Sequence, residues 1–98
     1  MSHYNYIPKE VCQRALENWG KDRQMLQLFE ELSELQKEVI KNMNRRKDNL
    51  DEIAEEAADV LIMMEQLLHI YGIADKVQEQ AARKVQRLKG VLGMDTTC

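Results

Sequence analysis

Two segments of this sequence repeat apolar side chains every three or four residues, and each also carries two carboxylates three residues apart. The first pair is Glu31 and Glu34, and the second is Glu56 and Asp59. The apolar spacing is typical of amphipathic α-helices, in which residues three apart lie on the same side. A stretch of 21 residues separates Glu34 from Glu56, which suits two antiparallel helices joined by a short polar loop. The sequence therefore predicts four carboxylates facing each other across a helix pair.

The same periodicity predicts an all-α helical bundle of about four helices within one domain that spans residues 1–98. The predicted helices cover about 8–18, 21–43, 51–71 and 73–88, with a polar connector at 42–50. Pro8 suits a first helical turn, and Gly20 and Gly72 suit the turns between helices. Only one proline, four glycines and 5% aromatic residues are present, which favours helices over a sheet.

Short polar residues mark the start of the third predicted helix. Asn49 or Asp51 is expected to cap it, because such side chains accept hydrogen bonds from the free backbone N–H groups of a first turn. Residues 1–7 are expected to form an extended arm, and the tail from Gly90 onward is expected to fray.

Each central helix is expected to carry an apolar stripe, and part of the second of these helices carries more apolar surface than one neighbouring helix can cover. The expected stripes are Met25, Leu28, Leu32, Leu35 and Val39 on the first, and Ile53, Ala57, Val60, Met64, Leu67 and Tyr71 on the second. Residues 61–64 are apolar around most of the helix circumference. Burial in the middle of the bundle and burial against a second subunit both account for this. We expect a contribution from each, in a homodimer or homotetramer.

Four crowded carboxylates repel one another unless a divalent cation lies among them. Ligands that offer only oxygen favour Mg²⁺ over zinc, and Mn²⁺ is expected to substitute for it. Mg²⁺ held in this way keeps positions for water and phosphate oxygens, so the pattern predicts phosphate chemistry. A single acidic pair is also typical of a solvated helix face, and that alternative stays open. The expected ligands are Glu31, Glu34, Glu56 and Asp59, with Glu38 and Glu55 as outer candidates.

Basic and aromatic residues have two interpretations each. Arg83, Lys84, Arg87 and Lys89 on the last predicted helix either balance the acidic helices as a solvated face or reach phosphate oxygens. Trp19, the single tryptophan, is either a packing residue or a platform on which a base stacks.

Charge and hydropathy exclude several classes of protein. The net charge of −3 and pI near 5.4 leave no basic footprint for nucleic acid. No apolar run approaches the ~20 residues of a membrane span, and residues 1–8 lack the pattern of a signal peptide. Cys12 and Cys98 are expected to be free thiols in a reducing cytoplasm.

Both acidic segments resemble the signatures of the MazG-like nucleotide pyrophosphohydrolases, which are all-α enzymes of the superfamily that includes the dimeric dUTPases. The first is Gln24–Leu35 (QMLQLFEELSEL) and the second is Glu52–Leu61 (EIAEEAADVL). Together they give the family's E-x-x-E…E-x-x-D order, and the resemblance covers roughly residues 19–88. It implies that a nucleoside triphosphate is split between its α- and β-phosphates, which releases a monophosphate and pyrophosphate.

The resemblance also implies roles for single residues. It makes Glu31, Glu34, Glu56 and Asp59 the Mg²⁺ ligands, Lys84 and Arg87 the phosphate contacts, and Trp19 and Gln24 the lining of the base side of the pocket. The family often has an Asn near the basic pair, and this sequence does not reproduce it. A water is expected to attack the α-phosphorus, with Glu34 or Glu55 orienting or deprotonating it.

These observations lead us to expect a Mg²⁺-dependent nucleoside triphosphate pyrophosphohydrolase in nucleotide-pool cleaning or control. One alternative is a non-catalytic helical interaction module, whose acidic faces only keep it soluble. The other is a nucleotide-binding sensor with the same fold. A response to Mg²⁺ distinguishes the first alternative from the enzyme, because such a module has no reason to bind the ion.

Overall fold

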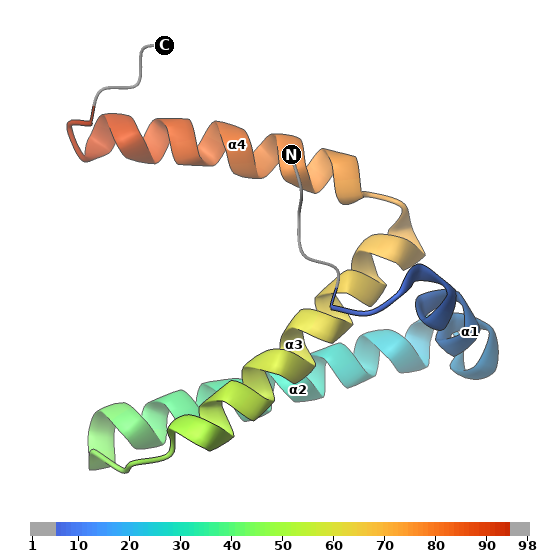
Figure 1. The fold of residues 1–98 in the computed structure, drawn as a ribbon, viewed down its shortest axis with the longest axis horizontal. Helices are drawn as coiled ribbons and strands as arrows, with labels where there is room; N and C mark the ends of the chain where they lie inside the picture. The colour runs from blue at the N-terminus through green and yellow to red at the C-terminus, as the bar shows by residue number, and fades with distance from the viewer. Residues whose placement is uncertain (1–5, 95–98) are drawn as a thin grey trace.

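The computed structural model of this protein describes residues 6–94. Within that range the chain forms helices and no strand (Figure 1). The helices are α1 (Lys9–Trp19), α2 (Lys21–Arg45), α3 (Leu50–Tyr71) and α4 (Ala74–Val91). The all-α class and the antiparallel central pair are confirmed. Most of the predicted arm lies outside the described residues, and α4 continues past Gly90, where the sequence predicted fraying.

Glycines end α1 and α3 as expected. Gly20 has φ 85° and Gly72 has φ 63°, which are values that favour glycine because it has no Cβ to clash. After Gly72, the N–H of Ile73 donates to the carbonyl of Leu68 at 3.2 Å, as in a Schellman helix ending. These turns set the directions in which α2 and α4 leave.

Asn49 ties the α2–α3 loop together, and it does so differently from the predicted helix cap. Its side chain makes no capping hydrogen bond. Instead, its Nδ2 donates to the backbone carbonyl of Glu38 at 2.9 Å and to Glu38 Oε1 at 2.8 Å. Asn42 Nδ2 donates to Asn49 Oδ1 at 3.3 Å and to the carbonyl of Lys47 at 3.1 Å. Asn49 is only 1% exposed, and a buried amide needs hydrogen-bond partners. Its side chain finds these partners on α2 and does not cap α3.

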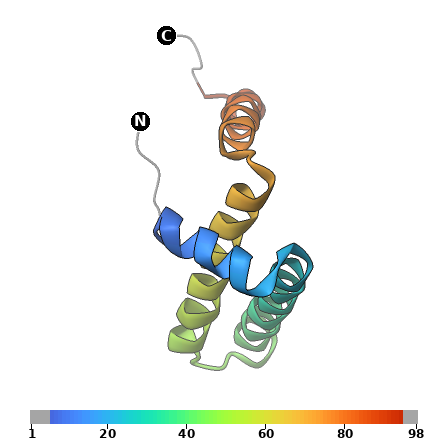
Figure 2. The same cartoon turned by 90° about the vertical axis from the view of Figure 1, so that its right-hand side faces the viewer.

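The hydrophobic core lies between α2 and α3. Met25, Leu28 and Met63 form its buried centre, with Leu67 and Ile70 packed against it. Helix α1 lies across the pair and packs on both helices (Figure 2), where it buries Cys12 and Ala15. His69 Nε2 and Gln13 Oε1, 2.8 Å apart, link α3 to α1.

Helix α3 turns a different side toward the core than the predicted stripe. Met63, Gln66 and Ile70 face inward. Leu67 of the predicted stripe also packs on the core, whereas Met64 and Tyr71 of that stripe are exposed. On α2, Leu32 is likewise exposed. Because residues 61–64 of α3 are apolar around most of the helix circumference, more than one side could have faced α2, and periodicity alone did not distinguish them. The other apolar side is left largely uncovered.

Helix α4 projects away from the three packed helices (Figures 1 and 2). None of its residues is buried. Among the described helices, no single one is long and apolar enough to cross a membrane. Only α3 and α4 taken together meet the length and hydropathy requirement, and they are bent by 117° at the break between them.

Removing the Asn49 side chain should destabilise the fold. Asn49→Ala leaves its partners on Glu38 and Asn42 without their hydrogen bonds, which should lower the free energy of unfolding by about 1–3 kcal/mol. Urea denaturation followed by circular dichroism measures this change. Asn44→Ala is the matched control, because Asn44 is exposed near the same end of α2, and its effect should stay within about 0.5 kcal/mol. Equal effects of the two substitutions would contradict the assigned role of Asn49.

Candidate metal centre

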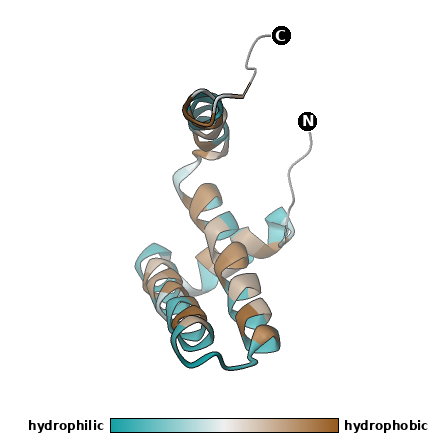
Figure 3. Ribbon diagram, turned by 90° about the vertical axis from the view of Figure 1, so that its left-hand side faces the viewer, coloured by the Kyte–Doolittle hydropathy of each residue, from teal (hydrophilic) through white to brown (hydrophobic). Residues whose placement is uncertain are grey.

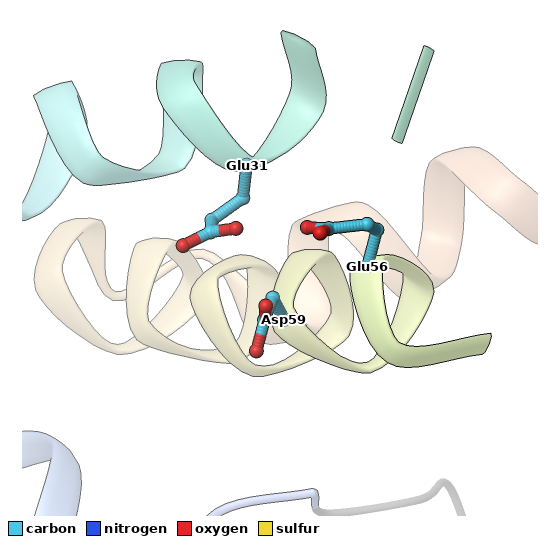
Figure 4. Close-up of side chains that lie close together, drawn as sticks. All are labelled: Glu31, Glu56 and Asp59. Carbon is cyan, nitrogen blue, oxygen red and sulfur yellow. The ribbon is translucent and has the colours of Figure 1, made fainter. Parts of the chain in front are cut away.

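Three of the four predicted ligands meet between α2 and α3. One carboxylate oxygen from each of Glu31, Glu56 and Asp59 lies within 4.8 Å of the others. Glu31 reaches down from α2, while Glu56 and Asp59 extend from successive turns of α3 (Figure 4). Two helices thus supply converging oxygen atoms, as the acidic spacing predicted.

The helix register explains why these residues meet. Asn49 contacts Glu38 at the loop end of the pair. Seven residues further from the loop on each helix are Glu56 on α3 and Glu31 on α2. Seven residues are about two helical turns, so Glu31 and Glu56 both lie on the facing sides of their helices, at the same level along the pair. The hydrogen bonds between Asn49 and Glu38 therefore fix the register that aligns the carboxylates.

Cations pair with the neighbours of the cluster and not with its members. Lys37 Nζ lies 3.6 Å from Glu34, and Lys41 Nζ lies 3.1 Å from Glu38. Glu31 accepts a hydrogen bond from the neutral amide of Gln27 at 2.6 Å. Across residues 6–94, no Lys or Arg forms an ion pair with Glu31, Glu56 or Asp59. The converging oxygens thus keep their negative charge uncompensated.

The pKa of Glu56 reflects this crowding. Partial desolvation raises it above the ordinary value of 4.5, and the charges of Asp59, Glu31, Glu34 and Glu55 raise it further. The pKa of Glu38 moves the opposite way, because the hydrogen bonds from Asn49 and Lys41 favour its charged form. The surroundings of these two carboxylates therefore move their pKa values in opposite directions, and a cation bound at the cluster would relieve the repulsion on Glu56.

Glu34 and Glu55 lie at the margin of the cluster. Both are exposed, and both charges act on Glu56, but neither belongs to the group of converging oxygens. Glu34 and Glu31 border a shallow hollow on α2 together with Leu26 and Phe29. Sequence reasoning did not single out these two apolar neighbours, although Phe29 is the single phenylalanine of the chain.

The residues predicted for the base side do not form one pocket. Trp19 is exposed at the end of α1 and borders a hollow lined by α1 residues alone. Gln24 is buried on α2, and its Oε1 has no hydrogen-bond partner. Gln66 on α3, which sequence reasoning missed, is also buried with an unpartnered Oε1. Both amides belong to the interior of the packed helices.

The predicted phosphate contacts are held away from the acidic cluster. Lys84 and Arg87 are exposed on α4, which does not pack on α2 or α3 (Figure 1). A single chain in this conformation therefore brings the carboxylates together without the basic pair.

The donor set fits a hard divalent cation. The three groups offer only carboxylate oxygens, they come from two rigid helices, and no side-chain cation neutralises them. Mg²⁺ accepts such ligands and retains water at its remaining positions. Soft metals that favour sulfur have no ligand in this group, because all three of its members are carboxylates.

Comparisons of the chain with protein-family models, with curated proteins and with solved structures find no match.

The pH dependence of stability should reveal the repulsion between Glu56 and its neighbouring carboxylates. A carboxyl group whose folded pKa is raised stabilises the metal-free fold fully below its unfolded pKa, and this contribution is lost as the pH rises through the folded pKa. The difference in unfolding free energy between wild type and Glu56→Gln, measured by urea denaturation in EDTA, should therefore fall from pH 4 toward pH 7.

Glu38→Gln is the control with the opposite sign. The pKa of Glu38 is lowered, so its stabilising contribution is present above the unfolded pKa and is lost as the pH falls through the folded one. Parallel pH profiles for wild type and Glu56→Gln would show that the crowding has no energetic effect.

Proposed function

We propose that this protein is a divalent-cation-dependent hydrolase of nucleoside triphosphates that releases pyrophosphate, with Mg²⁺ as the expected ion. The observation that carries the proposal is the convergence of Glu31, Glu56 and Asp59 from two facing helices. The resemblance of both acidic segments to the MazG-like signatures gives the reaction class. Nucleotide-pool cleaning or control is the proposed role.

Different residues of the chain would bind the cation and activate the attacking water. Glu31, Glu56 and Asp59 would hold the cation, which would offset phosphate charge and lower the pKa of a bound water. Glu34 lies one turn from Glu31, outside the converging group and beside Lys37, and its carboxylate would orient an attacking water or accept its proton. Glu55, next to Glu56 and exposed, is the second candidate for this role.

Lys84 and Arg87 remain the proposed phosphate contacts. A triphosphate carries more negative charge than one divalent cation neutralises, so side-chain cations are useful beside it. Since α4 stands apart from the cluster, this contact requires an α4 to approach the α2–α3 pair. Trp19 and Gln24 are the proposed base contacts, and Gln24 would have to become accessible for that role.

A non-catalytic interaction module is the second candidate function. The exposed apolar side chains of α4 favour it, because they offer a surface to a partner. Such a module would neither bind Mg²⁺ nor release pyrophosphate. A nucleotide sensor would bind both Mg²⁺ and nucleotide without turnover.

Purified protein incubated with a panel of ribo- and deoxyribonucleoside triphosphates and Mg²⁺ should release pyrophosphate from at least one of them. EDTA should abolish the release. Glu56→Gln should lower kcat on the order of 10²-fold or more, because it removes a charged ligand. Glu30→Gln should leave kcat unchanged, since Glu30 is exposed on α2 next to Glu31 and outside the converging group. Orthophosphate as the sole inorganic product would exclude the proposed bond cleavage.

Mg²⁺ should also stabilise the folded protein. At a concentration ~100 times its Kd, the gain in unfolding free energy should be about 2.7 kcal/mol, because the ion binds only the folded state. Thermal unfolding across a Mg²⁺ titration measures this gain, and Glu56→Gln should reduce it while Glu30→Gln should not. A melting temperature that stays constant over the whole titration would exclude the site.

A further inference from the structure

The C-terminal helix α4 exposes an apolar stripe that no other element within residues 6–94 covers. Val77, Ala81, Val85 and Leu88 recur every three or four residues, which places them on one side of the helix. All four are exposed, and Val85 and Leu88 are 50% and 53% accessible. In Figure 3, the hydropathy colouring shows α4 with both apolar and polar sides. An 18-residue amphipathic helix of this kind is ordinarily stabilised by packing its apolar side.

The chain as a whole exposes more surface than a compact monomer. Its accessible surface is 7890 Å², whereas a compact monomer of 11.5 kDa exposes about 5,800 Å². Its radius of gyration is 16.6 Å, against about 12.6 Å for a compact domain of this length. The excess is about 2,000 Å². The whole excess is comparable to the area that each subunit of an obligate homodimer buries.

Charge is divided between two helices that do not pack on each other. Helix α3 carries six carboxylates and no Lys or Arg, while α4 carries five Lys or Arg and two carboxylates. With His69 neutral, the net charges are −6 and +3, and α1 and α2 are each neutral overall. The strongest electrostatic attraction available to α4 is therefore toward an α3.

Helix α3 also has the apolar surface to receive α4. Its side that turns away from the core includes Leu61 and Met64, which are 40% and 37% exposed, and the half-buried Ile53 and Ala57. Within one chain, α4 leaves α3 at Gly72 with a bend of 117°, and the two helices diverge from that point (Figure 1). The α4 of a second copy has no such restriction.

We propose that two copies of this chain form a twofold dimer in which the α4 stripe of each packs on the exposed apolar side of the partner's α3. The arrangement is isologous, since each copy supplies one α4 and one α3, and it closes without leaving an unpaired stripe. It covers both apolar surfaces and brings the basic helix onto the acidic one. It does not depend on the proposed enzymatic activity.

Sedimentation of the full chain at micromolar concentration tests the proposal. The wild type should sediment as a dimer, and Val85→Glu and Leu61→Glu should each weaken the dimer at least about 100-fold, because each places a charge in an apolar contact. Gln86→Glu adds the same charge at the next position of α4, away from the stripe, and should remain dimeric. Circular dichroism should show unchanged helix content in all three variants, since none of these side chains belongs to the core.

The salt dependence of dimerisation distinguishes this arrangement from a dimer held together by apolar contacts alone. Raising NaCl from 0.05 to 0.5 M should weaken the dimer, because it screens the attraction between α4 and α3. A monomeric wild type would overturn the proposal. A Leu61→Glu protein that stays dimeric while Val85→Glu dissociates would also overturn it, because α4 would then be docking somewhere other than α3.

Discussion

The hydrogen bonds of Asn49 are the constraint on which the site depends. A buried amide that contacts both the backbone and the carboxylate of Glu38 fixes where the end of the loop sits along α2. Once that position is set, helical geometry determines which side chains face each other further along. A slip of one residue would rotate the facing surfaces by about 100° and move Glu56 away from Glu31. The alignment of the carboxylates thus originates in the loop, two turns away from them.

Carboxylates held this closely oppose folding. In the metal-free chain, the raised pKa of Glu56 shows that the charged form is less favourable there than in water. The opposition has to be outweighed by the core of Met25, Leu28 and Met63 and by the packing of α1. Carboxylates that converge without an ion pair are candidates for binding an external cation. The neighbouring pairs, Lys37 with Glu34 and Lys41 with Glu38, show that α2 supplies cations to other carboxylates of the same helix.

Much of the fold followed from local patterns in the sequence. The helix bounds depend on apolar periodicity and on Gly20 and Gly72, whose left-handed or otherwise positive φ values are a local property. The meeting of Glu31 with Glu56 and Asp59 followed from i, i+3 spacing on antiparallel helices. The role of Asn49 could not be predicted from the sequence. An asparagine at this position can either cap α3 or form hydrogen bonds with the preceding helix, and the sequence is the same in both cases. The side of α3 that faces the core was only partly predicted, because residues 61–64 are apolar around most of the helix circumference and give no periodic signal to orient the helix.

The separation of α4 from the other helices has a physical basis in the same segment. The left-handed Gly72 and the Schellman bond to Leu68 end α3 sharply, and the resulting bend directs α4 away from its own neighbours. A chain of this size has a limited core, and it buries a smaller fraction of its surface than a larger domain does. The opposite net charges of α3 and α4 would not stabilise a monomer by direct contact, because the two helices do not pack on each other within one chain. The same charges become useful when a second copy brings α4 to α3, and the acidic helix that carries Glu56 and Asp59 would then gain both a neighbour and partial neutralisation.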